Sequence, residues 1–302
     1  MTASTPPRAP DPTPSAAPAA RVPNGPVGEL RVAARSAGFV GLTFSLLACL
    51  EADLRASPDA RARAITHKWM GRYGKALLRL YGLEVTVTGA FPREDRGASS
   101  GEGARGLYSG KDARGKGRMF VMNHRSMLDI FVDLAFVEAN TVSRADLSRW
   151  PVIGIAARKV GTLFVDRASK QSGAAVINAM CAALEEGRGV LVYPEGTTFA
   201  GDEVRPFRPG AFIAAARSGA EIIPLGIAYG GAGTAYVDEP FAAHYRRVTG
   251  APSTKIGLAF GEPIAVTEGA DVEALRALAH ERVEALVRAA RASIGEGPSV
   301  AP

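Results

Sequence analysis

The spacing of apolar residues follows two periods along most of the chain, and each period predicts a different element. Leu83–Gly89 alternates apolar and polar side chains, which predicts a half-buried strand, and short apolar runs predict buried strands elsewhere. These runs lie at 118–122, 161–165, 189–193, 221–229 and 255–260. Helical spacing occurs at 127–137, 172–186, 210–218 and 271–291. Strands that alternate with helices predict an α/β fold with a mixed, largely buried sheet flanked by helices.

An apolar stretch near the N-terminus predicts a helix in contact with a membrane. Between Arg35 and Glu51 lie 15 residues without a charge. As a helix this stretch would rise about 22 Å, which is shorter than the roughly 30 Å hydrocarbon core of a bilayer. It therefore predicts an interfacial or half-inserted anchor, and a helix buried in the protein core is the alternative.

The next segment, 55–79, holds seven basic residues and one acidic residue, so its net charge of +6 equals that of the whole chain. Four apolar residues repeat on one helical face: Ile65, Trp69, Tyr73 and Leu77. Basic amphipathic helices bind membrane surfaces that contain anionic lipid. The alternative is a solvated helix whose apolar stripe packs on the domain, and Gly71 and Gly74 weaken the helix prediction. Together the two segments predict an N-terminal helical hairpin on the cytoplasmic face of the inner membrane.

Composition divides the 302 residues into four regions. Residues 1–29 are crowded with Pro and Ala and predict a disordered tail without the pattern of a secretory signal. Residues 30–82 form the membrane-associating helical region, and 83–291 form the main domain with a flexible Gly/Arg/Ser-rich insertion at 93–117. Residues 292–302 predict a disordered C-terminal tail. The two cysteines, Cys49 and Cys181, have no metal-ligand spacing, so no metal site is predicted.

His124 and Asp129 are the residues best suited to chemistry. They lie between the apolar run 118–122 and the predicted helix 127–137, on a strand-to-helix turn. A carboxylate at this position could hold one imidazole nitrogen protonated and leave the other free to accept a proton from a hydroxyl. Taken alone, the pair is also compatible with a capped turn that has no catalytic role.

Three further blocks follow strands or lie in loops, where sites are usually built. They are Gly161-Thr162-Leu163-Phe164-Val165-Asp166-Arg167, Tyr193-Pro194-Glu195-Gly196-Thr197-Thr198 and Ile222-Ile223-Pro224-Leu225-Gly226-Ile227. With Asn123-His124-Arg125-Ser126-Met127-Leu128-Asp129, and in this order, they resemble the four motifs of the glycerolipid acyltransferase family. Its best-known members are 1-acyl-sn-glycerol-3-phosphate acyltransferases. The resemblance covers roughly 35–264 and implies that 83–291 is an acyltransferase catalytic domain with this family's fold.

The resemblance implies a role for each matching residue. His124 would be the general base and Asp129 the group that orients it. Arg167 would hold the acceptor phosphate, and Glu195, Gly196 and Thr197 match the third motif, in which Glu195 either binds acceptor hydroxyls or braces the loop. Arg144 and Arg208 match basic positions between and after the motifs. Thr198 stands where the family most often has Arg, which removes one expected phosphate contact.

The implied activity is transfer of an acyl group from acyl-CoA or acyl-carrier protein to the hydroxyl of a lysolipid, without a cofactor. The leading acceptor is 1-acyl-sn-glycerol-3-phosphate (lysophosphatidate), which would give phosphatidate. Lyso-ornithine lipid or another lysophospholipid is the alternative, because Thr198 departs from the family. A function of another class is non-catalytic binding of anionic lipid at a membrane surface. Nucleic acid is not an expected partner, since no nucleic-acid motif accompanies the basic segment.

Overall fold

The computed structural model describes residues 25–58, 61–91, 106–165, 170–231, 233–295 and 297. The strands are β1 (Leu83–Gly89), β2 (Met119–Met122), β3 (Asn140–Arg144), β4 (Leu163–Val165), β5 (Val190–Val192), β6 (Ile222–Tyr229) and β7 (Thr254–Phe260). The helices are α1 (Pro26–Arg55), α2 (Ala62–Tyr81), α3 (Asp129–Phe136), α4 (Ile153–Lys159), α5 (Lys170–Glu185), α6 (Gly210–Ser218), α7 (Phe241–Gly250) and α8 (Val272–Ser293). A short 3₁₀-helix, η2 (Ala145–Arg149), precedes α4.

The strands form one seven-stranded sheet in the order β1-β7-β6-β2-β5-β3-β4. Adjacent strands are parallel except for β6 and β7, which are antiparallel. All eight residues of β6 are buried, as expected for a central strand that is covered on both faces. The predicted α/β fold with a mixed, largely buried sheet is therefore confirmed.

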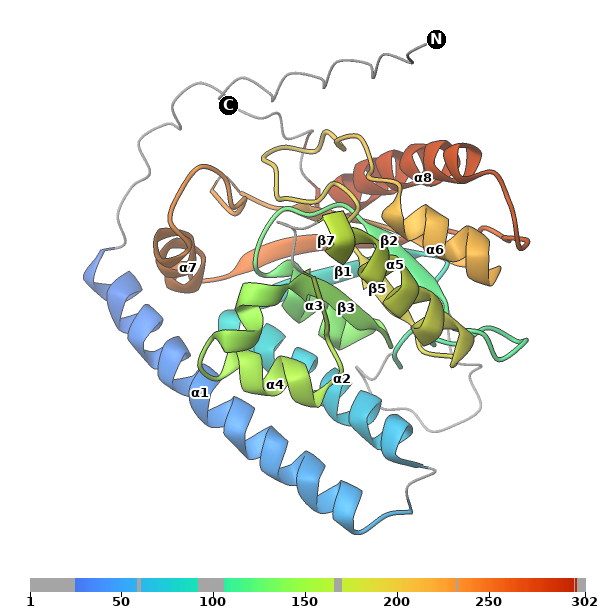
Figure 1. The fold of residues 1–302 in the computed structure, drawn as a ribbon. Helices are drawn as coiled ribbons and strands as arrows, with labels where there is room; N and C mark the ends of the chain where they lie inside the picture. The colour runs from blue at the N-terminus through green and yellow to red at the C-terminus, as the bar shows by residue number, and fades with distance from the viewer. Residues whose placement is uncertain are drawn as a thin grey trace, which may run out of the picture.

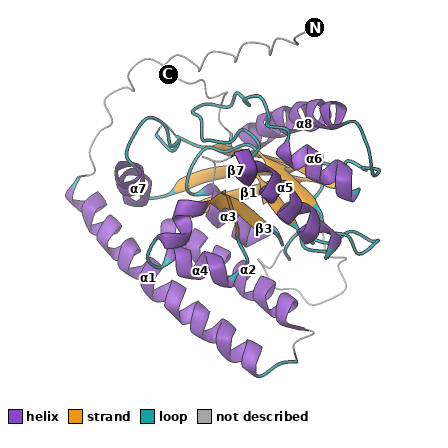
Figure 2. Ribbon diagram, in the orientation of Figure 1, coloured by secondary structure: helices purple, strands orange, loops and turns teal. Residues whose placement is uncertain are grey.

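Helices cover both faces of this sheet (Figure 2), and the side chains of β2 show how the two layers divide. Phe120 and Met122 belong to a buried cluster that includes residues of α2 and α3. Met119 and Val121 point the opposite way and pack with residues of α5, α6 and α8. Because successive side chains of a strand alternate between faces, four consecutive apolar residues serve two cores.

α2 packs closely on α3, and this contact uses the apolar side of the basic helix. A Cβ atom at Gly74 would lie 2.3 Å from the backbone nitrogen of Ala135, so the two helix backbones touch at this point. Leu77 and Tyr81 are buried in the same contact region of the core. Of the predicted apolar stripe, Leu77 thus packs in the domain core, as the alternative interpretation of 55–79 expects, and Ile65, Trp69 and Tyr73 are partly buried.

α1 starts at Pro26, four residues before the predicted boundary at 30, with a proline in the first turn, where a missing N–H costs nothing. Its 30 residues span about 45 Å along the outside of the molecule (Figure 1). Arg35 fastens α1 to the domain, because its guanidinium donates hydrogen bonds to the carbonyl oxygens of Leu80, Thr249 and Ala251. α1 is thus a docked helix with one uncovered side.

The predicted flexible insertion at 93–117 is wrong for its second part. Tyr108 is buried and stacks on Phe260, with ring centroids 5.5 Å apart. The Asp112 carboxylate accepts hydrogen bonds from the backbone N–H groups of Arg114 and Lys116 and so closes a turn. The low-complexity composition predicted flexibility, although Tyr108 packs in the core and Asp112 closes a turn. The rest of the insertion, the tail before residue 25 and the last residues of the chain lie outside the described residues.

Candidate active site

The site lies where the carboxyl ends of three neighbouring strands meet. His124 follows β2, Glu195 follows β5, and Tyr229 ends β6, while β2 pairs with both β5 and β6. Ligand sites of α/β sheets characteristically lie outside the carboxyl ends of the strands. The sheet order therefore brings together the first and third sequence blocks, although about 70 residues separate them.

His124 and Asp129 interact directly, as the sequence predicted. The Nδ1 atom of His124 lies 2.7 Å from Oδ2 of Asp129, which is fully buried in the first turn of α3. The same oxygen accepts hydrogen bonds from the backbone N–H groups of Arg125 and Ser126. The other oxygen, Oδ1, accepts a 2.5 Å hydrogen bond from the hydroxyl of Tyr229.

These donors decide the tautomer of the imidazole. Asp129 accepts from two backbone N–H groups and a phenol, so it faces Nδ1 as an acceptor and Nδ1 carries the hydrogen. Burial raises the pKa of Tyr229 well above its usual range, and the charge of Asp129 raises it further, so this hydroxyl stays a donor. Nε2 of His124 then presents a lone pair, and its ring lines a cavity. The pair can act as an oriented general base.

Glu195 braces the loop and does not line the cavity. It is buried with Arg125, and their charged groups are 2.9 Å apart. Its carboxylate also accepts the backbone N–H groups of His124 and Arg205. Because Glu195 accepts from several donors, removing it would leave the Arg125 guanidinium buried and unpaired. Of the two roles left open by the sequence, the structure favours bracing.

A second histidine supports the same turn from behind. The Nε2 atom of His244, in α7, lies 3.2 Å from the hydroxyl oxygen of Ser126. Both residues are buried, and neither lines the cavity beside His124. Ser126 therefore anchors the turn to α7.

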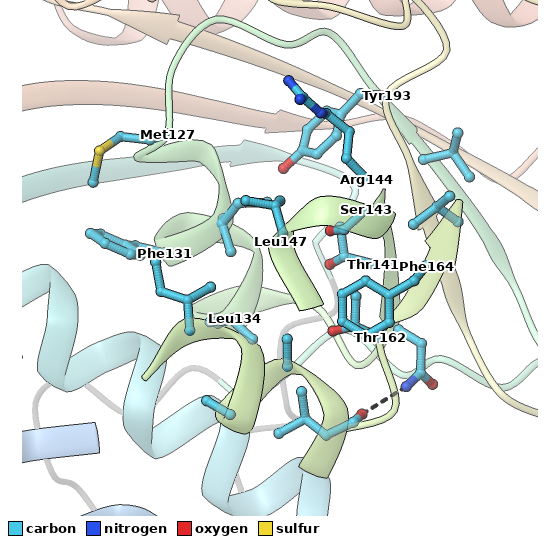
Figure 3. Close-up of a pocket in the computed structure, with 18 of the residues that line it drawn as sticks. Met127, Phe131, Leu134, Thr141, Ser143, Arg144, Leu147, Thr162, Phe164 and Tyr193 are labelled. Carbon is cyan, nitrogen blue, oxygen red and sulfur yellow. Dashed lines mark hydrogen bonds between the residues drawn. The ribbon is translucent and has the colours of Figure 1, made fainter. Parts of the chain in front are cut away.

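A mostly apolar cavity of about 790 Å³ opens beside His124. Figure 3 shows Met127, from the turn before α3, with Phe131 and Leu134 of α3 on one side, and Thr141, Ser143 and Phe164 of β3 and β4 on the other. α1 and α2 complete the apolar wall with residues that include Phe39, Leu46, Leu50, Trp69, Met70 and Leu77. A cavity of this size and lining suits a ligand with a long hydrocarbon chain.

Arg208 and Gly196 lie together at the cavity. A Cβ atom at Gly196 would come within 2.4 Å of Nε of Arg208, and the φ angle of Gly196 is +81°, so only glycine fits here. The guanidinium of Arg208 makes no ion pair within the described part of the chain. It is therefore available to an anionic group of a ligand.

The other predicted binding residues differ in their surroundings. Arg144 also lines the cavity, but its guanidinium pairs with Asp146 at 2.9 Å. Thr197 is exposed, and the hydroxyl of Thr198 donates a hydrogen bond to the carbonyl oxygen of Tyr236. Arg167 lies outside the described residues. No group of His, Cys, Asp and Glu within the described ranges is arranged to hold a metal ion.

Sequence reasoning missed Tyr229, Asp133 and the roles of Arg125 and Tyr193. Tyr229 reaches Asp129 from a strand 100 positions away, so no local pattern reveals it. Asp133 had a usable signal, because an acidic residue inside an apolar helix and four positions after Asp129 shares its face. Tyr193 was part of the third block, but its ring stacks on the imidazole of His124 only because the sheet order places β5 beside β2.

Three comparisons bear on the family. Residues 107–228 match the family description "Acyltransferase". The lyso-ornithine lipid O-acyltransferase of Pseudomonas aeruginosa is 30% identical over 222 residues, which cover 71% of this chain and 75% of that protein. The chain belongs to the acyltransferase family. The 1-acyl-sn-glycerol-3-phosphate acyltransferase of Neisseria gonorrhoeae is also 30% identical, over 126 residues that cover 41% of this chain and 49% of that protein.

The fold is shared with a solved member of the same family. The crystal structure of the 1-acyl-sn-glycerophosphate acyltransferase PlsC from Thermotoga maritima superposes with a TM-score of 0.57 at 18% sequence identity. The match covers 85% of this chain and 98% of that one. At this identity the likeness concerns the fold alone. The chain spans about half the length of the neisserial relatives that it matches.

Proposed function

We propose that this acyltransferase moves a fatty acyl group from a thioester, acyl-CoA or acyl-carrier protein, to the hydroxyl of a lysolipid. The observation that carries the proposal is the imidazole of His124, held at Nδ1 by Asp129 and lining an apolar cavity. The acyl chains would occupy the apolar part of this cavity.

The reaction needs one proton to move twice. Nε2 of His124 takes the proton of the acceptor hydroxyl as its oxygen attacks the thioester carbon. Asp129 stabilises the imidazolium through the hydrogen bond to Nδ1, and the departing thiolate leaves as a thiol with that proton. Positioned general-base catalysis contributes typically about 10²–10⁴-fold, which is sufficient for an activated thioester without an acyl-enzyme.

For the acceptor, two observations favour lyso-ornithine lipid over lysophosphatidate, which reverses the order expected from the sequence. The 30% identity to the lyso-ornithine lipid O-acyltransferase of Pseudomonas aeruginosa extends over 222 residues. The 30% identity to the neisserial 1-acyl-sn-glycerol-3-phosphate acyltransferase extends over 126 residues. The charged groups of the cavity also fit a zwitterion. Arg208 could pair with the carboxylate of an ornithine head group, and Asp146, whose carboxylate already pairs with Arg144, could in addition accept from its ammonium.

Membrane association is the second part of the proposal. Four large apolar side chains of α1 are exposed on one side of the helix: Val27, Leu30, Val40 and Phe44. α1 is also long and apolar enough to cross a bilayer by length and composition. We propose that it lies on or partly in the cytoplasmic leaflet of the inner membrane, where lysolipid acceptors reside.

The experiment is an acceptor panel with purified protein in mixed micelles and an acyl-CoA or acyl-carrier-protein donor. We expect transfer to lyso-ornithine lipid with a kcat/KM at least about tenfold above that for lysophosphatidate, a difference of about 1.4 kcal/mol. Preferential transfer to lysophosphatidate would restore it as the acceptor.

His124→Ala is the test of the mechanism. We expect it to reduce kcat by about 10²–10⁴-fold while vesicle binding is unchanged. Transfer at the wild-type rate by this variant would refute His124 as the base. No transfer to any lysolipid by the wild type, with binding to anionic vesicles retained, would favour the non-catalytic lipid-binding function.

A further inference from the structure

The imidazole of His124 has a second neighbour besides Asp129. The ring of Tyr193, immediately after β5, stacks on it with centroids 4.0 Å apart and planes inclined by 17°. The hydroxyl of Tyr193 donates a hydrogen bond to Oδ2 of Asp133 in α3. The turn at 123–129 has other contacts that hold it, made by Asp129, Glu195 and Ser126.

The Asp129 hydrogen bond fixes only one edge of the imidazole. A ring held at one edge can still pivot about that contact, which would swing Nε2 away from the acceptor hydroxyl. A stacked ring blocks the pivot. We propose that Tyr193 and Asp133 form a clamp that fixes the plane of the His124 ring, Tyr193 by stacking on it and Asp133 by anchoring the Tyr193 hydroxyl.

Asp129 and Asp133 are one helical turn apart on α3, so their side chains share a face. Both are buried, and each accepts a hydrogen bond from a tyrosine hydroxyl, Tyr229 and Tyr193 respectively. The two Asp–Tyr pairs therefore hold His124 at its edge and on its face. One short helix thus supplies both constraints.

Burial raises the pKa of Asp133 well above its usual range; the hydrogen bond from Tyr193 opposes this rise, and the charge of Asp129 adds to it. Burial thus shifts this carboxyl toward its neutral form, and a neutral carboxyl still accepts a hydrogen bond from Tyr193. Asparagine has the same shape and the same acceptor oxygen. While Tyr193 carries its hydroxyl, the clamp therefore needs an oxygen acceptor at position 133, and Asp133→Asn should preserve it.

The stack also supports the charged intermediate of the reaction. Once Nε2 has accepted a proton, the imidazolium lies over the electron-rich face of the tyrosine ring, which is a favourable cation–π arrangement. Tyr193 is therefore a positioning residue whose loss should lower kcat more than it raises KM.

The first experiment compares Tyr193→Leu with Tyr193→Phe in the full chain. We expect Tyr193→Leu to lower kcat about 100-fold, the effect of a small misplacement of a reacting group, with little change in KM. Tyr193→Phe keeps the stacked ring and should stay within about fivefold of the wild type. Tyr108→Leu removes a buried tyrosine far from the site and should lower the melting temperature without lowering kcat.

The second experiment tests Asp133 through rescue. Asp133→Leu leaves the Tyr193 hydroxyl buried without an acceptor, so the ring should shift and kcat should fall about tenfold. Adding Tyr193→Phe removes that hydroxyl, and the double variant should recover the kcat of Tyr193→Phe alone. Independent, multiplying losses in the double variant would overturn the anchoring role of Asp133.

A spectroscopic measurement reports ring geometry without turnover. The chain has four histidines, so the His124 ring protons can be assigned in labelled protein by their absence in His124→Ala. Stacking on Tyr193 should shift these resonances upfield, and the shift should persist in Tyr193→Phe and vanish in Tyr193→Leu. An unchanged spectrum in Tyr193→Leu would overturn the clamp.

This inference rests on the proposed acyl transfer through His124, and the two can fail separately. Full activity of His124→Ala would refute the proposed function. Loss of activity in His124→Ala together with a wild-type kcat in Tyr193→Leu would leave the function intact and refute the clamp alone.

Discussion

α1 and α2 pack against each other, but the apolar side of α2 is covered by the domain, whereas one apolar side of α1 is exposed. The inner side of α2 is closed by α3, with Gly74 in backbone contact and Leu77 completely buried. α1 is fastened through Arg35 and through a 2.6 Å hydrogen bond between the hydroxyls of Thr43 and Tyr73. Its opposite side keeps Val40 and Phe44 exposed.

The difference shows that an amphipathic pattern identifies an apolar face but does not identify its partner. The basic helix was predicted to bind the membrane because of its charge, although Leu77 of its apolar stripe is buried in the core. Two of its cations have contacts within the protein, since Lys68 pairs with Asp53 and Arg72 lies over the ring of Trp69. The uncovered apolar surface lies on α1, whose exposed residues within 30–52 are all uncharged.

Gly74→Val should produce the largest effect, because it breaks the covered contact. A valine side chain would meet the backbone of Leu134 and Ala135 at less than 3 Å, so α2 and α3 must separate. Overpacking of this kind costs typically about 1–3 kcal/mol, and we expect about 3 kcal/mol here since the neighbouring atoms are backbone. Denaturant unfolding of the purified variant measures this loss.

Gly41→Ala on α1 is the matched control, because a Cβ at Gly41 has open space around it. The substitution should stabilise the chain by about 0.5–1 kcal/mol through its helix propensity. Equal destabilisation by both variants would contradict the distinction between a covered and an uncovered helix.

The glycines illustrate which features a sequence can reveal. Gly74 weakened the helix prediction by propensity, whereas the structure needs it because two helices cross there. Strands and helices with a clear period, such as β1 and α8, were predicted almost to the residue. α4 and α7 were missed, because short helices of mixed composition lack a periodic signal.

The residues of the candidate site also divide into those that the sequence could pair and those that it could not. His124 and Asp129 are five residues apart and could be paired from sequence, because a strand-to-helix turn brings them together. Their partners lie at the ends of β5 and β6: Tyr193 and Glu195 follow β5, and Tyr229 ends β6. Only the strand order makes these residues neighbours of His124 and Asp129. The bracing role of Glu195 depends on its buried contact with Arg125, which no spacing predicts.

Replacing the exposed residues of α1 should have the second largest effect. Val40→Asp with Phe44→Asp removes two apolar side chains from the uncovered side and leaves the inner residues Phe39 and Thr43 in place. Burial of such side chains is worth about 1.5–3 kcal/mol each. Because only part of that burial is expected at a membrane surface, partition into phosphatidylcholine–phosphatidylglycerol vesicles should fall about tenfold.

A double substitution on α8 controls for charge. Ala285→Asp with Ala289→Asp adds the same charge at the same spacing on another exposed helix face. Its partition should change much less, since no apolar contact is lost. Equal losses in both double variants would mean that general electrostatic repulsion, and not the apolar side of α1, controls binding.

The smallest expected effect is the pH dependence of stability, which should differ between α2 and α1. Burial lowers the pKa of His67 in α2, the nearby Glu138 carboxylate opposes this shift, and Arg63 adds to it. At mildly acidic pH the folded state therefore binds fewer protons at His67 than the unfolded chain does. The stability that neutral His67 contributes is fully present above the pKa of the unfolded chain, about 6.5. It is lost as the pH falls through the lower pKa of the folded state. The covered contact of α2 should therefore weaken between about pH 7 and pH 5, while the apolar side of α1 carries no comparable group.

His67→Gln tests this pH dependence, because glutamine fills a similar volume and does not titrate. Its unfolding free energy should fall less steeply on acidification than that of the wild type, and the two curves should diverge below about pH 6.5. Parallel curves would show that His67 is not the group that makes α2 sensitive to acid. A steeper loss in His67→Gln would mean that protonated His67 gains more from Glu138 than it loses by burial, which would reverse the direction inferred from the structure.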